Sequence, residues 1–237
     1  MNTLSDFFSD KFINKGASKN NIVVYFLGRL TYPMSLIFSK MGVTPNQITT
    51  LSTFFAILSA IALVYSDNYV LFMTFWSISL LLDFCDGTLA RMTGQVRITA
   101  FRYDHTSDLF KIFFVVLAAS IKFNDLLLWS ASAIAIFLFI LYNALSCESD
   151  CTRRLRKDAS FMYENDSIKR IKSYTKNTIL SHFLPILFTI SGHTLLLFLI
   201  FPVGKVATIV ILIYFSLLSL LGIIRTIVYL KSLEKIV

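Results

Sequence analysis

The sequence is poor in charge. Asp, Glu, Lys and Arg make up 15% of its 237 residues, against about 25% in soluble domains. Hydrophobic residues make up 56%, and the mean hydropathy is +0.70. A soluble core cannot bury that much apolar surface, so the composition excludes a soluble globular domain. It indicates an integral membrane protein that crosses the bilayer several times.

Cysteine is also scarce. The chain has only Cys85, Cys147 and Cys151, and this odd count excludes a complete disulfide framework, so we expect reduced thiols. The spacing of the last two cysteines does not match a zinc knuckle. The first 21 residues mix acids and amides without the basic, apolar and small-residue order of a signal peptide, so no signal peptide is expected.

Long apolar runs are what the sequence does contain, and they predict six membrane spans in one all-α domain covering residues 1–237. The runs are Ile48–Tyr65, Tyr69–Leu82, Leu109–Phe123, Leu126–Leu145, Ile179–Phe201 and Val206–Tyr229. We expect them to form a six-helix bundle within residues 45–231, with Thr44 capping the first span and Pro45 at its first position. The polar, basic stretch Cys147–Asn177 is expected to form a loop or surface helices.

The segment before the first span is apolar but marginal as a span. Arg29 and Pro33 interrupt the run Ile22–Phe38. Such a run favours an amphipathic helix lying at the membrane interface, which we expect within residues 22–41.

The distribution of positive charge predicts the orientation. If the N-terminus and the aspartate-rich segment share one side, all of the 22 Lys and Arg residues except Lys122 and Lys205 fall on that side. This pattern predicts that the first side, and with it any active site there, faces the cytoplasm. The net charge of +8 then reflects topology and attraction to anionic lipids. No nucleic-acid partner is expected, since basic residues are not interleaved with exposed aromatic residues.

Four aspartates between Leu82 and Lys111 are the strongest functional signal. Asp83 and Asp86 lie three residues apart at the end of the second span, and Asp104 and Asp108 lie four apart before the third. Residues at these spacings share a helix face, so two antiparallel helices would present two carboxylates each to one pocket. Acidic residues at a membrane edge indicate function, and carboxylates are ligands for hard divalent cations. Two such ions suit phosphoryl transfer.

The same stretch resembles the signature of the CDP-alcohol phosphotransferase family, which is DxxDGxxAR, eight residues, then GxxxDxxxD. This chain reads DFCDGTLAR, MTGQVRIT and AFRYDHTSD. All positions of the signature match except the second glycine, which is Ala100 here. Alanine is nearly as small as glycine, so we expect tighter helix packing and retained chemistry. The segment VTPNQIT also resembles the opening of the family's first span.

The resemblance implies a membrane enzyme that moves a phosphoalcohol group from a CDP-alcohol to a hydroxyl acceptor and releases CMP. It implies Mg²⁺ or Mn²⁺, with two ions expected, and a homodimer among membrane lipids. Asp83, Asp86 and Asp104 would bind the metal, while Asp108 would share in this or act as general base. The expected CDP-binding residues are Asn46, Thr49, Gly87, Ala90 and Arg91.

Several of these residues also have simpler interpretations. Asn46 and Thr49 could merely cap a helix, and Arg91 could extend toward the lipid headgroups. The pair Asp104–His105 in the second half of the motif resembles the choline and ethanolamine branch of the family, but His105 could equally be an ordinary polar residue. Arg153, Arg154 and Arg225 are candidates for binding the acceptor or for contacting anionic headgroups.

Two substrate hypotheses follow. The basic residues after the fourth span favour CDP-diacylglycerol as donor and a polyol or polyol phosphate as acceptor. His105 favours a CDP-linked small alcohol and a lipid acceptor. A divalent-cation transporter is the non-enzymatic alternative, but it predicts carboxylates at mid-membrane on several spans rather than at one end. An inactive scaffold is a further alternative if Ala100 prevents catalysis.

Overall fold

The computed structural model describes residues 22–66, 68–95, 98–159 and 192–234, and side chains are not described at 22–25, 98–101, 147–159, 192–194 and 232–234. The described chain consists of helices and turns, and no strand occurs in it. The predicted all-α class is therefore confirmed for this part of the protein.

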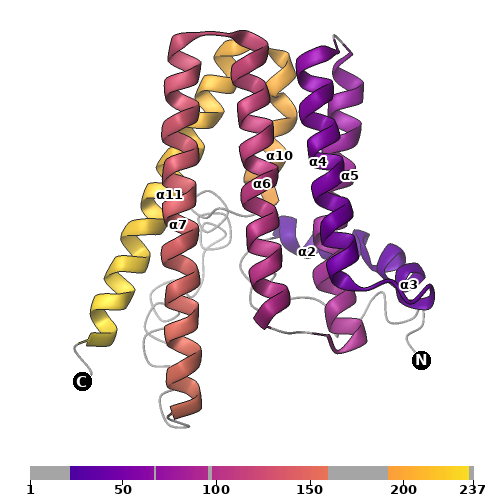
Figure 1. Cartoon of the computed structure of the whole chain (residues 1–237), viewed down its shortest axis with the longest axis vertical. Coiled ribbons are helices and arrows are strands. Elements are labelled where there is room, and N and C mark those ends of the chain that lie inside the picture. Colours follow the sequence, from indigo (N-terminus) through magenta and orange to yellow (C-terminus); the bar gives the residue numbers. More distant parts are fainter. Residues whose placement is uncertain (1–21, 67, 96–97, 160–191, 235–237) are drawn as a thin grey trace.

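Eight α-helices and one 3-10 helix lie within the described residues. In chain order they are α2 (Ile22–Leu30), α3 (Tyr32–Lys40), α4 (Pro45–Tyr65), α5 (Tyr69–Thr93), α6 (Ile98–Phe123), α7 (Leu126–Ala159), α10 (Gly192–Leu197), η2 (Phe198–Val203) and α11 (Lys205–Glu234). Helices α4, α5 and α6 lie side by side, α7 pairs with α11, and α2 and α3 lie across the lower part of the bundle (Figure 1).

Four of these helices contain segments long and apolar enough to cross a membrane: Pro45–Tyr65, Tyr69–Thr93, Leu126–Ser146 and Lys205–Lys231. Helix α6 packs among them but is more charged, because it carries Asp104, Asp108, Lys111 and Lys122. Most of the predicted fifth span, Ile179–Phe201, lies outside the described residues. An integral membrane protein is thus supported, and the number of six spans stays a prediction.

Two boundaries differ from those predicted. The segment Ile22–Phe38 forms two helices rather than one, separated at Thr31, with Pro33 in the first turn of α3 where a missing N–H costs no helical hydrogen bond. The fourth predicted span ended at Leu145, whereas α7 continues to Ala159 through sequence assigned to a loop or surface helices. The interfacial position of α2 and α3 stays a prediction.

Thr44 and Pro45 begin α4 as predicted. Thr44 is the N-cap, its backbone N–H donates to the Gln47 side chain at 2.9 Å, and Pro45 occupies the first turn. Helix α5 begins at the Asn68 cap and runs without a break to Gly94, whose φ of 69° ends it in the left-handed region. The two aspartates of α5 therefore lie on an uninterrupted extension of a membrane helix.

The turns that contain Ser66, Asp125 and Gly204 meet at one end of the bundle. Lys205 at the start of α11 forms an ion pair with Asp125 in the turn between α6 and α7. Lys122 near the end of α6 donates to the carbonyl of Ser66, which follows α4, at 3.2 Å. These contacts join the ends of four helices, and so they agree with the alternating topology that the charge pattern predicts.

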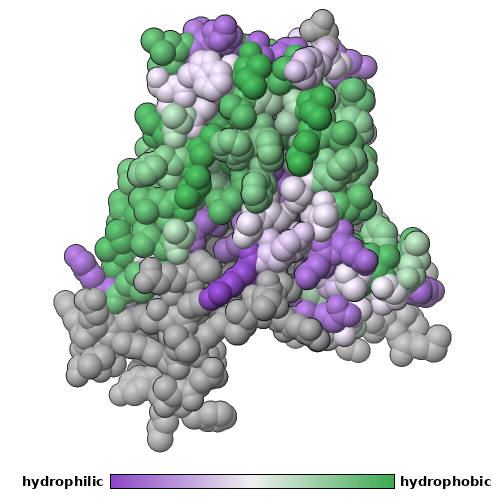
Figure 2. Space-filling view, viewed as in Figure 1, coloured by the Kyte–Doolittle hydropathy of each residue, from purple (hydrophilic) through white to green (hydrophobic). Residues whose placement is uncertain are grey.

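Polar contacts align α4 with α5 inside an apolar core. Ser52 and Ser79 are fully buried, and each hydroxyl donates to the other residue's carbonyl at 2.8 Å. The Trp76 ring of α5 lies 5.9 Å from that of Phe198 in η2, measured between ring centroids, and so connects the two halves of the bundle. A broad apolar band crosses the molecule between hydrophilic side chains at its upper edge and a further group of hydrophilic side chains below (Figure 2).

Candidate metal centre and active site

The antiparallel arrangement of α5 and α6 brings the four aspartates together. Asp83 and Asp86 lie on α5, and Asp104 and Asp108 lie on α6. Carboxylate oxygens of Asp83, Asp86 and Asp104 lie within 4.8 Å of one another, as do ligand atoms of Asp104, His105 and Asp108. Either group has the donor number and spacing that a divalent cation needs in part of its coordination shell.

Helix α4 supports this cluster through a row of hydroxyl groups. The Thr49 hydroxyl donates to Oδ2 of Asp86, and both side chains are buried. Two further hydroxyl pairs connect α4 to α6: Thr50 with Tyr103, and Thr53 with Ser107. Thr49, predicted as a CDP-binding residue, thus orients one carboxylate, because a hydrogen bond to a charged acceptor fixes its position.

Lys111 is the site residue that the sequence analysis missed. Its side chain is only 5% exposed, its Nζ forms an ion pair with Oδ1 of Asp83, and the same Nζ lies 2.8 Å from Oδ1 of Asp108. The available signal was its register, since Lys111 follows Asp104 by seven residues and Asp108 by three on one helix face. The contact with Asp83 on the other helix carried no sequence signal.

The carboxylates fit a divalent cation. Oδ1 of Asp104 is buried and has no hydrogen-bond partner among the described residues, which is unfavourable for a buried acceptor unless a cation is supplied. Asp104 precedes the apolar part of α6, and burial together with the nearby Asp83, Asp86 and Asp108 raises its pKa. Oδ1 of Asp108 is also buried without a hydrogen bond of suitable geometry, although it lies within ion-pair distance of the Lys111 Nζ atom.

The predicted nucleotide-binding residues lie along the same end of α5. Nη2 of Arg91 donates to the Thr88 hydroxyl at 3.3 Å, and its guanidinium group passes close to Gly87, where an added Cβ would lie 3.5 Å from Nη1. Ala90 is partly buried on this helix, and Asn46 is exposed in the first turn of α4. A Cβ at position 87 would therefore meet the guanidinium group at an ordinary van der Waals distance.

The structure does not place the remaining candidates at this cluster. Arg153 and Arg154 lie on the extended part of α7, where side chains are not described, and Arg225 is exposed on α11. Ala100 lies in the first turn of α6, and its side chain is also outside the described set. Their roles, like those of all the candidate residues, stay predictions.

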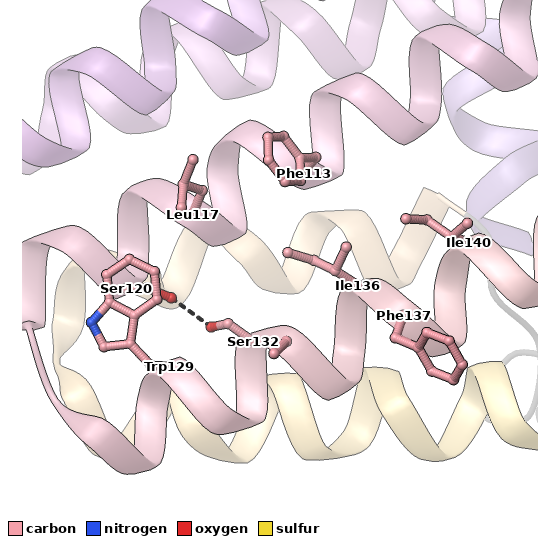
Figure 3. A pocket seen from close by; sticks show the side chains of 9 residues that line it. Phe113, Leu117, Ser120, Trp129, Ser132, Ile136, Phe137 and Ile140 are labelled. Carbon is pink, nitrogen blue, oxygen red and sulfur yellow. Dashed lines mark hydrogen bonds between the residues drawn. The ribbon is translucent and has the colours of Figure 1, made fainter.

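A groove of about 380 Å³ between α6 and α7 is separate from the carboxylates. Figure 3 shows its lining of apolar side chains, among them Phe113, Leu117 and Ile136, with Ser120 and Ser132 hydrogen-bonded at 2.7 Å. No titratable residue lines it. A groove of this kind suits contact with apolar surface and offers no chemistry, so we assign the functional site to the aspartates.

Fold and site together define an integral membrane protein of helices with a carboxylate cluster able to hold a divalent cation at one end. Residues 42–233 match the CDP-alcohol phosphatidyltransferase family, and the chain belongs to that family. Its members are transferases of a phosphoalcohol group from a CDP-alcohol, so the resemblance noted in the sequence is confirmed. No curated protein matches the chain.

Proposed function

We propose that this protein transfers a phosphatidyl group from CDP-diacylglycerol to the hydroxyl of a polyol or polyol phosphate, with release of CMP, in phospholipid synthesis. The observation that supports this best is the convergence of Asp83, Asp86 and Asp104 beside Asp108, within a chain of the family. Members of the family share the overall reaction, so the finer part of the proposal is the identity of donor and acceptor.

In the reaction, the acceptor oxygen attacks the phosphorus that bears the lipid group. A new phosphorus–oxygen bond forms, the bond from that phosphorus to the bridging oxygen breaks, and CMP leaves with the bridging oxygen. Asp108 takes the acceptor proton, because it lies at the inner end of the aspartate face on α6 and is partly accessible. Arg91 pairs with the donor phosphates, and Asn46 contacts the cytidine.

Asp83, Asp86 and Asp104 are the residues that would hold Mg²⁺ or Mn²⁺, since hard cations prefer carboxylate oxygens. When bound, the ion neutralises charge on the phosphates and stabilises the transition state. Thr49 keeps Asp86 oriented for this role through its hydrogen bond. The buried and unpartnered oxygen of Asp104 supports the assignment.

A second candidate function is transfer from a CDP-linked amino alcohol to a lipid hydroxyl. It is favoured by His105, whose ring nitrogen lies within 4.8 Å of ligand atoms of Asp104 and Asp108. The charge pattern, with Arg153 and Arg154 on the same side as the aspartates, favours CDP-diacylglycerol and an acceptor with a phosphate.

The wider setting of the proposed function follows from topology. We place the active site on the cytoplasmic side, because nearly all Lys and Arg residues lie on the side of the aspartates. The domain spans residues 1–237, and the active form is a homodimer, as the family resemblance implies. Acyl chains of the donor remain among membrane lipids while its headgroup reaches the aspartates.

The test is CMP release by the purified full-length protein with Mg²⁺. CDP-diacylglycerol is compared with CDP-choline and CDP-ethanolamine, each with a panel of acceptors, and Asp108→Asn serves as the inactive variant. Acceptor-dependent CMP from CDP-diacylglycerol alone is the expected result. CMP only from a CDP-amino alcohol would support the second candidate, and no CMP from any donor by a folded protein would refute both.

A further inference from the structure

The buried ion pairs of Lys111 distinguish two regions within the aspartate cluster. Three carboxylates, those of Asp83, Asp86 and Asp104, converge on one another. Asp108 instead has the Lys111 ammonium group 2.8 Å from its Oδ1, and the same ammonium group contacts Asp83. A monovalent cation of the protein itself thus bridges Asp83 and Asp108.

The Lys111 ammonium group is buried and does not form a flexible contact at the surface. Only 5% of the Lys111 side chain is exposed, and its helix neighbour Ile112 and Val115, one turn further on, are buried in the apolar core. A buried ammonium group is strongly unfavourable unless it is paired, and here its two partners come from two different helices. Lys111 therefore has a defined place between Asp83 and Asp108, and leaving that place would expose a charge to apolar side chains.

A divalent ion bridging Asp83 and Asp108 would compete with Lys111 for the same oxygens. Mg²⁺ needs oxygen ligands at about 2.0–2.1 Å in a near-octahedral shell, and Lys111 already occupies Oδ1 of both residues. The two positive charges would also repel each other at short range in a partly buried site. Of the trio Asp83, Asp86 and Asp104, only Asp83 contacts Lys111, and it does so through Oδ1 alone. Oδ1 of Asp104 is buried and has no hydrogen-bond partner among the described residues, so it is open to a divalent cation.

We propose that Lys111 takes the place of a second metal ion, so that this protein binds one divalent cation per chain at Asp83, Asp86 and Asp104. The inference rests on the proposed function and changes the expected number of ions from two to one. Lys111 is then a positioning residue, which anchors Asp108 beside the ion and leaves that carboxylate to accept the proton of the acceptor hydroxyl.

The test counts bound ions by titrating the purified full-length protein with Mn²⁺ and recording its electron paramagnetic resonance spectrum. The wild type is expected to bind one Mn²⁺ per chain with the signal of an isolated ion. Lys111→Met removes the charge and keeps the length of the side chain, and it is expected to bind two Mn²⁺ with a spin-coupled spectrum. Lys122→Met is the matched control on the same helix, and it should bind one.

Two ions in the wild type, or no ion, would overturn the proposal, as would a folded Lys111→Met variant that still binds one. If Lys111→Met does not fold, Lys111→Arg is measured instead. This variant keeps the positive charge and is expected to bind one Mn²⁺ per chain, and binding of two Mn²⁺ would overturn the proposal. CMP release is measured on the same wild-type preparation. Two bound ions with CMP release would overturn this inference alone, whereas one bound ion without CMP from any donor would refute the proposed function alone.

Discussion

Replacing Asp104 by asparagine should stabilise the ion-free protein and abolish its response to Mg²⁺. Oδ1 of Asp104 is buried without a hydrogen-bond partner, and leaving such a group unsatisfied costs about 1–3 kcal/mol. Its carboxylate also lies within 4.8 Å of those of Asp83 and Asp86, and two unit charges at that distance repel by about 3 kcal/mol at an effective dielectric constant near 20.

The repulsion is an upper bound because burial and the neighbouring carboxylates raise the pKa of Asp104 and favour its neutral form. We therefore expect Asp104→Asn to raise the unfolding free energy of the ion-free protein by about 1–3 kcal/mol, or the melting temperature by about 2–12 °C. A carboxyl with a raised pKa binds more protons when folded, so wild-type stability falls as pH rises from the ordinary aspartate range toward the raised value. The advantage of the variant should grow over that range.

The assay is thermal unfolding in detergent, first with a chelator and then with Mg²⁺. Saturation at about 100 times the dissociation constant should stabilise the wild type by about 2.7 kcal/mol, and Asp104→Asn should lose this gain together with CMP release. Asp125→Asn is the control, since it makes the same chemical change at the opposite end of the bundle, where Lys205 is the partner. It should be slightly less stable without ions and should still respond to Mg²⁺. Destabilisation of the chelated protein by Asp104→Asn would refute the reasoning.

Three further variants test the packing and the orientation of the site. Gly222→Ala would place a Cβ 2.5 Å from the Tyr142 ring, so it should lower the free energy of unfolding by about 1–3 kcal/mol despite the better helix propensity of alanine. Adding Tyr142→Ala to this variant should restore stability. A loss of stability that Tyr142→Ala does not rescue would contradict the contact. Trp76→Phe removes a 2.9 Å hydrogen bond to a carbonyl of α10 and should cost about 1 kcal/mol in thermal unfolding, whereas an unchanged melting curve would exclude that bond. Thr49→Val removes the donor to Asp86 and should slow CMP release by roughly 10- to 100-fold. Thr49→Ser keeps the hydroxyl and should keep the rate. Equal rates for the two variants would show that the hydroxyl is dispensable.

The sequence predicts the apolar helices well because their signal is local. Runs of apolar residues and the Thr44–Pro45 start define α4 and α5 closely, and the spacing of the aspartates predicts which helix faces carry them. What brings those faces together is not local. The Thr49 hydroxyl reaches Asp86 because α4 packs against α5, where Ser52 and Ser79 also hydrogen-bond the two helices to each other.

The features that the sequence did not predict have a common physical reason, which is that they depend on partners distant in the chain or on weak local signals. The polar part of α7 has no apolar periodicity, so its helical continuation to Ala159 has no hydrophobic signature. Thr31 is not a helix breaker, yet the helix ends there, and its hydroxyl donates to the carbonyl of Leu27 at 3.0 Å. The position of Lys111 in the helix is not unusual, and its burial is explained by pairing with Asp83 on α5 in addition to Asp108 on its own helix.

The gathering of turns at the end opposite the aspartates has a consequence for biogenesis. If the chain enters the bilayer from the side of the aspartates, Lys122, Asp125 and Lys205 are the described charges in these turns that must be translocated, and each charge costs about 2.5–3.5 kcal/mol at the centre of the membrane. Asp125 and Lys205 then meet on the far side and neutralise each other. With that direction of entry, the four carboxylates of the candidate site do not make the passage, so the chain can keep four acids and a buried lysine without any of them crossing the membrane during insertion.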